Sequence, residues 1–292
     1  MNKYSFKPLI LLVFCILALV FLLGAERYSK KNEPINTDLV SEKNTSGKDK
    51  KKESKVTKDK PSNEDKGSFY GNNPVKVLLA VGTCGSLQEG GFARIYEEPD
   101  EASLVVGKLQ YNCTVKITED YDDEWYSVDV SGDGDTGYVK KENCKPVEIS
   151  IGSADPVRDK IVKKAYSYLG LPFKRYGKSL EVGVDCSNFI QQIYKLYGFE
   201  IPNRPLEQRD YGKPVKEEEA LPGDMVYYDK ANDGTGHVAI YLGDGMMINS
   251  SGHSGQKYPQ GGVRICCLLY KDRDSCQLYN LLDAEGQESD GQ

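Results

Sequence analysis

Cys186, His237 and Asn249 are the residues of this sequence best suited to covalent chemistry. A cysteine thiolate attacks amide carbonyls, and an adjacent imidazole activates the sulfur and protonates the departing amine. The 292 residues include only two histidines, His237 and His253, so one of them must serve Cys186 if this residue is a nucleophile. An Asn side chain can hold the imidazole in place, as the third member of a catalytic triad does. The set predicts a cysteine hydrolase; the alternative is a buried, structural Cys186.

The sequence around Cys186 predicts a helix that begins at the proposed nucleophile. Phe189, Ile193 and Tyr197 are spaced by four residues and share one apolar face, and Gly198 ends the pattern. At the first turn of a helix, unpaired N–H groups and the helix dipole stabilise a thiolate. The backbone N–H of Cys186 is also expected to donate to the oxyanion of the reaction, and the sequence does not identify a second donor.

His237 is the preferred base because it begins a predicted strand over residues 237–242. His253 lies in a loop rich in Ser and Gly, and rigid elements hold catalytic geometry better than loops do. A Gly-Asp-Gly turn leads from this strand into a second one that contains Asn249. With an odd number of residues in the hairpin loop, His237 and Asn249 share a face, directly opposed or diagonal.

The N-terminal part of the chain predicts export. Residues 9–23 are apolar without interruption and follow Lys3 and Lys7, so residues 1–25 are expected to form a signal or transmembrane helix, and we favour an uncleaved membrane anchor. Residues 26–73 are polar and rich in Lys, as in a disordered linker. The predicted location is the extracellular face of the cell, attached to the membrane or, after cleavage, secreted.

Charge argues against one class of partner. The formal net charge is −6, and the basic residues are concentrated in the linker, which leaves the folded part more acidic still. Sequence-independent binding of nucleic acid depends on basic surface, so no nucleic-acid partner is expected.

Residues 74–148 predict a small all-β unit. Short β-rich runs are separated by turn residues, which is typical of a small barrel or sandwich. Trp125, the only Trp, is expected in its core. The predicted strands are residues 75–81, 92–96, 103–106, 113–117, 124–130 and 136–139.

Residues 153–285 predict an α+β unit, in which helices precede an antiparallel sheet. A helix is expected to start at Asp155-Pro156 and to end before Gly170, and the helix of Cys186 follows it. Residues 202–222 look irregular, and residues 286–292 are expected to be a disordered tail. The predicted strands are residues 224–228, 237–242, 246–249, 263–269 and 277–282.

Eight cysteines in an exported chain raise the question of disulfides. We expect one bridge within each unit and one between the units, with a pairing that sequence cannot give. The histidines do not lie near Cys pairs at zinc-finger spacing, so no metal and no cofactor are expected. The six cysteines considered, apart from Cys15 and Cys186, are Cys84, Cys113, Cys144, Cys266, Cys267 and Cys276.

Two parts of the chain resemble known families. Ala93-Arg94-Ile95-Tyr96, Trp125-Tyr126-Ser127-Val128 and Gly137-Tyr138-Val139 resemble the bacterial SH3-like module. Asp185-Cys186-Ser187-Asn188-Phe189-Ile190, Leu221-Pro222-Gly223-Asp224 and Gly236-His237-Val238-Ala239-Ile240 resemble the NlpC family of papain-like cell-wall peptidases. Asn188 stands where that family usually has Gly, and Asn249 where it most often has His.

The resemblance implies a substrate and further site residues. It implies a peptidoglycan stem peptide, cut between D-glutamate, through its γ-carboxyl, and a diamino acid. Phe173 stands where relatives have a substrate-contacting Tyr, with Tyr176 as the nearest hydroxyl. The other residues implied to bind substrate are Asp185, Ser187, Arg204 and Gln208. Arg204 and Gln208 lie in the matching loop after the helix, and for both the alternative is a structural role in turns and caps, which loop polar groups usually have.

Two alternatives to this endopeptidase remain open. One is a Cys/His amidase that cuts between muramic acid and L-alanine. The other is a catalytically inactive protein that binds the cell wall. The SH3-like module is expected to hold the protein on the wall or to form one side of a substrate cleft.

Overall fold

The computed structural model describes residues 70–85, 91–229, 236–268 and 276–283. These residues belong to one compact unit of the chain. The predicted anchor over residues 1–25, almost all of the linker over 26–73 and the tail over 286–292 lie outside the described residues. Within those described, no helix combines the length and the hydropathy that a membrane span needs.

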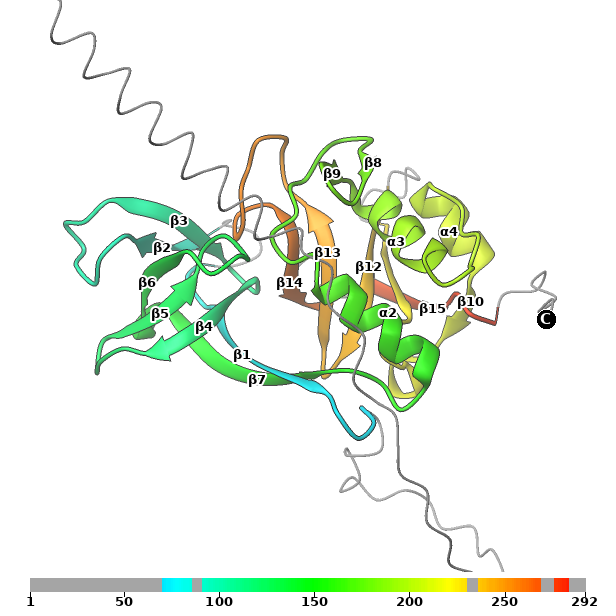
Figure 1. Ribbon diagram of the computed structural model, residues 1–292, viewed down its shortest axis with the longest axis horizontal. Helices are drawn as coiled ribbons and strands as arrows, with labels where there is room; N and C mark the ends of the chain where they lie inside the picture. Colours follow the sequence, from blue (N-terminus) through cyan, green and yellow to red (C-terminus); the bar gives the residue numbers. More distant parts are fainter. Residues whose placement is uncertain (1–69, 86–90, 230–235, 269–275, 284–292) are drawn as a thin grey trace, which may run out of the picture. The chain divides into compact units, whose positions relative to one another are not determined.

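The first folded unit is a seven-stranded antiparallel sheet with the strand order β3-β2-β6-β5-β4-β1-β7 (Figure 1). Its fold confirms the predicted all-β unit. Trp125 is 5% exposed and meets Tyr96 edge to face, with ring centroids 5.6 Å apart. The last strand, β7, was not predicted, and it contains Pro146 at the sheet edge, where a missing N–H is tolerated. The strands are β1 (Val75–Gly82), β2 (Phe92–Tyr96), β3 (Val105–Gln110), β4 (Thr114–Asp120), β5 (Trp125–Asp129), β6 (Thr136–Lys140) and β7 (Cys144–Ile151).

The second folded unit is α+β, as predicted, with helices before most of the strands of a six-stranded antiparallel sheet. Asp155 caps α2 (Pro156–Tyr166), because its carboxylate accepts hydrogen bonds from the N–H groups of Val157 and Arg158. Helices α3 (Cys186–Lys195) and α4 (Pro205–Tyr211) follow, with the small ribbon β8 (Lys178–Ser179) and β9 (Gly183–Val184) between α2 and α3. The sheet has the order β10-β15-β11-β12-β13-β14: β10 (Lys213–Val215), β15 (Cys276–Asn280), β11 (Met225–Tyr228), β12 (His237–Gly243), β13 (Met246–Ser251) and β14 (Gly262–Cys267).

Both faces of this sheet are covered by other parts of the chain. Residues alternate along each strand: Val238 and Ile240 join the hydrophobic cluster of α2 and α3, whereas Ala239 and Tyr241 join a second cluster. The second cluster contains core residues of the first unit, among them Val115. The two folded units therefore share a continuous core.

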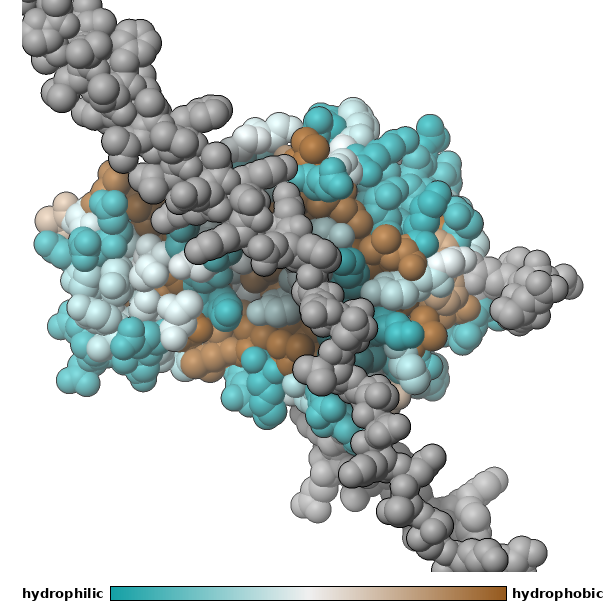
Figure 2. Space-filling view, viewed as in Figure 1, coloured by the Kyte–Doolittle hydropathy of each residue, from teal (hydrophilic) through white to brown (hydrophobic). Residues whose placement is uncertain are grey.

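Strands β1 and β7 contribute to both cores. They pair along their whole length, from Val75 opposite Ile151 to Gly82 opposite Cys144. Leu79 of β1 packs with the helices of the second unit, whereas the neighbouring Ala80 packs in the first. Figure 2 shows an apolar surface over β1 and β7. Leu78 of β1 and Val147 of β7 are partly exposed.

The cysteines do not form the three predicted bridges. No disulfide is recorded among the seven cysteines of the described residues. Cys113 and Cys266 lie opposite each other in an isolated antiparallel bridge between the units, with their sulfur atoms 2.9 Å apart, and Cys266 donates a hydrogen bond to Cys113. Burial raises the pKa of the Cys113 thiol well above its usual range. Cys84 instead donates to the side chain of Asn143, so its sulfur is turned toward a polar partner.

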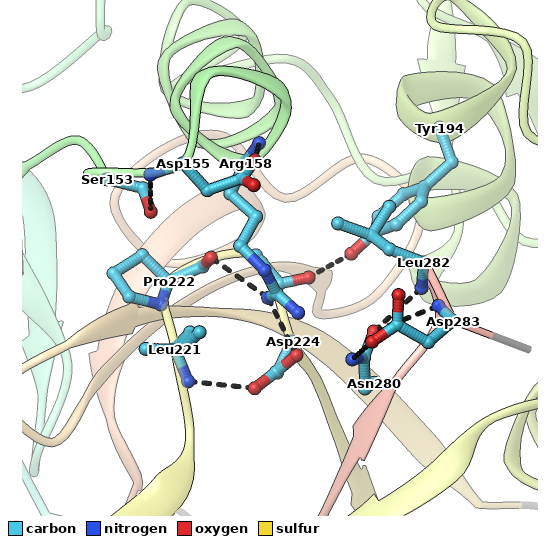
Figure 3. A network of polar contacts seen from close by, with 11 residues as sticks. Ser153, Asp155, Arg158, Tyr194, Leu221, Pro222, Asp224, Asn280, Leu282 and Asp283 are labelled. Carbon is cyan, nitrogen blue, oxygen red and sulfur yellow. Dashed lines mark hydrogen bonds and ion pairs between the residues drawn. The ribbon is translucent and has the colours of Figure 1, made fainter.

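A buried ion pair fastens α2 to the sheet (Figure 3). Arg158 of α2 lies 2.7 Å from Asp224, and both side chains are almost inaccessible. The same guanidinium donates to the carbonyl of Pro222, and the second oxygen of Asp224 accepts from the N–H of Leu221. Tyr194 of α3 donates to the carbonyl of Gly223, so both helices hold the turn that precedes β11.

Candidate active site

A cavity of about 730 Å³ in the second unit contains most of the predicted site residues. Cys186 and His237 both line it. Its described walls come only from the second unit, so within those walls the first unit does not form a side of the cleft. The lining residues are Phe173, Arg175, Tyr176, Lys178, Asp185, Cys186, Ser187, Asn188, Asn203, Arg204, Pro205, Tyr228, Gly236, His237, Ser250, Ser251 and Gly252.

Cys186 is the first residue of α3. Asp185 is the N-cap, and its carboxylate accepts a hydrogen bond 2.9 Å long from the N–H of Asn188. Phe189 and Ile193 are fully buried on the face of α3 that packs on the sheet. The helix start and the apolar face are therefore as predicted, and they leave the half-buried Cys186 at the edge of the cavity.

His237 and Asn249 are joined by a hydrogen bond of 3.1 Å between Nε2 of the imidazole and Oδ1 of the amide. Ile240 pairs with Ile248 across the hairpin, and this register places His237 and Asn249 on one face at diagonal positions. Asn249 is fully buried, and its amide nitrogen lies 3.4 Å from the carbonyl of Arg264. When Nε2–H is donated to Asn249, Nδ1 is the ring nitrogen that can exchange a proton with a thiol.

Tyr228 is a site residue that the sequence did not identify. It pairs with His237 in the register of β11 and β12, and the two rings are tilted by 31° with centroids 6.3 Å apart. Its hydroxyl donates to the carbonyl of Leu268, and burial raises its pKa, so the phenol stays neutral. It therefore forms a neutral, fixed wall beside the imidazole. The only signal in the sequence was its place at the end of a predicted strand.

Asp185 and Ser187, which flank the cysteine, turn toward two loops. The second oxygen of Asp185 accepts from the N–H of Tyr176, at 3.0 Å. The hydroxyl of Ser187 donates to the carbonyl of Asn203, at 2.8 Å. Both line the cavity, and both also hold a neighbouring segment of its rim.

The remaining predicted substrate contacts divide into two groups. Phe173, Tyr176 and Arg204 line the cavity, and Tyr176 is 74% exposed. Gln208 is fully buried in α4 and is not among the lining residues; its amide nitrogen donates to the carbonyls of Ser187 and Pro202. We therefore correct the expectation for Gln208, which holds the backbone behind the cavity. His253 is exposed and outside the cavity.

The described residues contain no cluster of three or more His, Cys, Asp or Glu side chains that could hold a metal ion. Cys186 and His237 are half-buried, and Asn249 is enclosed behind them. Chemically, the arrangement can form a thiolate and imidazolium pair at the edge of an open cavity.

Two family models match the chain. The NlpC/P60 family matches residues 170–261, and the bacterial SH3 domain matches residues 91–144. The first match contains Cys186, His237 and Asn249, and the second contains β2 to β6.

Three curated relatives match parts of the chain. It is 37% identical over 125 residues to the bifunctional muramidase/DL-endopeptidase CwlT of Bacillus subtilis, covering 41% of this chain and 36% of the relative. It is 37% identical over 97 residues to a gamma-D-glutamyl-L-lysine dipeptidyl-peptidase of Bacillus cereus, covering 32% and 29%. It is 32% identical over 100 residues to the murein DD-endopeptidase MepS/murein LD-carboxypeptidase of Escherichia coli, covering 34% and 52%. The matched part thus spans about a third to a half of each relative.

Proposed function

We propose that this chain, which carries a bacterial SH3 domain followed in sequence by an NlpC/P60 domain, is a peptidoglycan hydrolase. We infer that it is a cysteine endopeptidase that cuts the bond between the γ-carboxyl of D-glutamate and the diamino acid of the stem peptide. The relatives support the substrate, since their names include a DL-endopeptidase and a gamma-D-glutamyl-L-lysine dipeptidyl-peptidase. The relative MepS is named for a DD-endopeptidase and an LD-carboxypeptidase activity, so similarity to this group alone does not identify the bond that is cut.

The observation that carries the proposal is the placement of three side chains. Cys186 and His237 line one cavity, and His237 is bonded through Nε2 to the buried Asn249. A buried amide fixes the plane and tautomer of the ring, so Nδ1 serves the sulfur. These are the parts that thiol-dependent acyl transfer requires.

The reaction proceeds in two steps. The Cys186 thiolate attacks the γ-carbonyl carbon; the C–N bond breaks as the imidazolium of His237 gives its proton to the departing amine. A water molecule then gives a proton to His237 and attacks the thioester, which releases the D-glutamyl carboxylate and restores the thiol. The backbone N–H of Cys186 at the helix start can donate to the oxyanion, and loss of one such donor typically costs about a hundredfold in rate.

Digestion of purified muropeptides tests this function. We expect masses that correspond to cleavage after D-glutamate, and no product with Cys186→Ala or His237→Ala. Cys84→Ala is the matched control, because Cys84 lies in the first unit, outside the cavity, and its loss should leave the rate unchanged. Release of L-alanine-terminated peptide from muramic acid would identify an amidase instead. Unchanged muropeptide release by Cys186→Ala would refute the cysteine mechanism.

We also propose that the enzyme acts outside the cell, tethered by its N-terminal segment. The apolar run of residues 9–23 after two lysines supports this location. Fractionation of cells should place the full chain in the membrane, accessible to external protease, and its presence in the cytosol would contradict the proposal.

A further inference from the structure

We propose that the cavity selects stem peptides whose D-glutamate keeps a free α-carboxylate, through a cationic rim made of Arg175, Lys178 and Arg204. This inference rests on the proposed function and adds a specificity to it. Amidation of that carboxylate would remove the charge that the rim recognises.

The charge of the described cavity wall is opposite to that of the chain. Arg175, Lys178 and Arg204 line it, and among the described lining residues Asp185 is the one acidic side chain. The chain as a whole has a formal net charge of −6. A local excess of positive charge at a cleft raises the local concentration of anionic ligands.

Asp185 already accepts hydrogen bonds from the protein. Its negative charge therefore neutralises the positive charge of the rim only in part. One of its oxygens accepts from the N–H and from the side-chain amide of Asn188, at 2.9 and 2.8 Å. The other accepts from the N–H of Tyr176 at 3.0 Å. Its charge is thus spread over three donors of the protein, whereas Arg175 and Lys178 have no ion pair among the described side chains.

One side of the rim is held through Asp185. The bond to Tyr176 fixes the residue next to Arg175, whose guanidinium lies 5.2 Å from the centre of the Tyr176 ring. Lys178 begins β8 and pairs with Val184, which immediately precedes Asp185. Val184 and Asp185, the two residues before the nucleophile, thus hold the segment that carries Arg175 and Lys178.

The other side of the rim is held through Ser187. Its hydroxyl donates to the carbonyl of Asn203, and its own carbonyl accepts from the buried amide of Gln208. Arg204 follows Asn203 and is the N-cap residue of α4. Its ion pair with Glu207 is 3.5 Å long and exposed, so a ligand carboxylate can compete for the guanidinium.

The chemistry of the substrate fits this arrangement. In a γ-glutamyl peptide, the α-carboxylate lies a few bonds from the carbonyl that Cys186 attacks, so it reaches the walls beside the nucleophile. Guanidinium groups bind carboxylates through paired N–H donors, and these charge-assisted bonds are stronger than neutral ones. A primary amide has nearly the same shape but lacks the charge.

The test uses two stem peptides that differ only in this group, the free acid and the primary amide. Binding is measured by calorimetry with the Cys186→Ala variant of the full chain, so that turnover plays no part. We expect the acid to bind about tenfold more tightly, which corresponds to about 1.4 kcal/mol. We also expect this preference to shrink at high salt. Equal affinity for the two peptides would overturn the proposal.

Single variants of the rim test the residues. Added to Cys186→Ala, each of Arg175→Gln, Lys178→Gln and Arg204→Gln should weaken binding of the acid and leave binding of the amide unchanged. Lys195→Gln is the matched control, because Lys195 is an exposed cation in the last turn of α3, outside the cavity. A uniform loss of affinity for both peptides, or an equal effect of Lys195→Gln, would contradict recognition of the carboxylate by the rim.

This test separates the two proposals. If Cys186→Ala prefers the acid but the unaltered protein cleaves neither peptide, the proposed function fails and the rim stands. If both peptides are cleaved after D-glutamate and bound equally, the rim fails and the function stands.

Discussion

The orientation of the His237 ring depends on one buried amide, that of Asn249. It accepts from Nε2 of His237 and is itself fully enclosed on β13. The sequence predicted that His237 and Asn249 share a face if the hairpin loop has an odd number of residues, because side chains alternate along a strand. Their hydrogen bond agrees with that prediction. The role of Tyr228 was not predictable, since its neighbour across β11 and β12 depends on strand pairing.

Asn249→Ala is expected to lower kcat for muropeptides by about tenfold or more and to leave KM nearly unchanged. The imidazole would lose the partner that fixes its orientation, whereas the substrate rim would be intact. Steady-state kinetics check this. Asn249→Gln and Asn249→Asp keep an acceptor and serve as comparisons; a rise in KM alone would contradict an orienting role.

The residues beside Cys186 were placed less well by sequence. Resemblance assigned Asp185 and Ser187 to substrate binding, and the structure gives each of them a protein partner as well. For Gln208 both substrate binding and a structural role were open, and its burial and its bonds to backbone carbonyls agree with the structural role. Polar loop residues carry no periodic signal, so the sequence did not indicate whether such a side chain faces the cavity or the backbone.

At the scale of the elements, α3 depends on its cap. Asp185→Ala should lower the free energy of unfolding by about 1 to 2 kcal/mol, because the first turn would lose its side-chain acceptor. Asp185→Asn keeps an acceptor and is the control, with a smaller loss. Urea denaturation measures both; equal stability of Asp185→Ala and the unaltered protein would contradict the cap.

The buried pair of Arg158 and Asp224 gives a prediction about α2. Arg158→Met should destabilise the protein by about 3 to 5 kcal/mol at neutral pH, because a buried carboxylate would remain without its partner. The double variant Arg158→Met/Asp224→Leu should recover most of the loss, as measured by urea denaturation. A single variant as stable as the unaltered protein would show that the pair is solvated.

The loss of stability in Arg158→Met should depend on pH. Desolvation raises the pKa of Asp224, and the guanidinium of Arg158 opposes that shift. A carboxyl whose pKa is raised on folding is stabilising below its unfolded value of 3.8, and this contribution is lost as the pH rises through the folded pKa. Without Arg158 the pKa rises further, so Arg158→Met should be closest in stability to the unaltered protein under acidic conditions. A deficit that is constant with pH would contradict this.

Most elements were predictable and a few were not. The helices α2 and α3 and the hairpin of β12 and β13 follow from apolar spacing and turn residues. Helix α4 spans seven residues in a polar stretch, too short for a periodic pattern, and was therefore missed.

At the scale of the whole molecule, the shared core should make the two units unfold together. Val226 and Ala239 of the second unit pack with Val115 of the first. Apolar residues at successive positions of β11 and β12 are typical of strands covered on both faces, but only the structure shows what covers the second face.

Calorimetry should therefore give one thermal transition for the two units. A fragment that begins after β7 would expose the second face of its sheet, so we expect it to aggregate or to unfold. The full chain with exposed Lys108→Gln in β3 is a control for general effects of substitution. Two separate transitions, or an active isolated fragment, would show that the units are independent.

The shared core also has a consequence for the proposed hydrolase. If the SH3 domain binds a wall strand, the paired β1 and β7, which contribute to both cores, link the bound strand to the sheet that carries His237. The distance between the bound strand and the neighbouring stem peptides would then determine which peptide bonds the sulfur of Cys186 can reach.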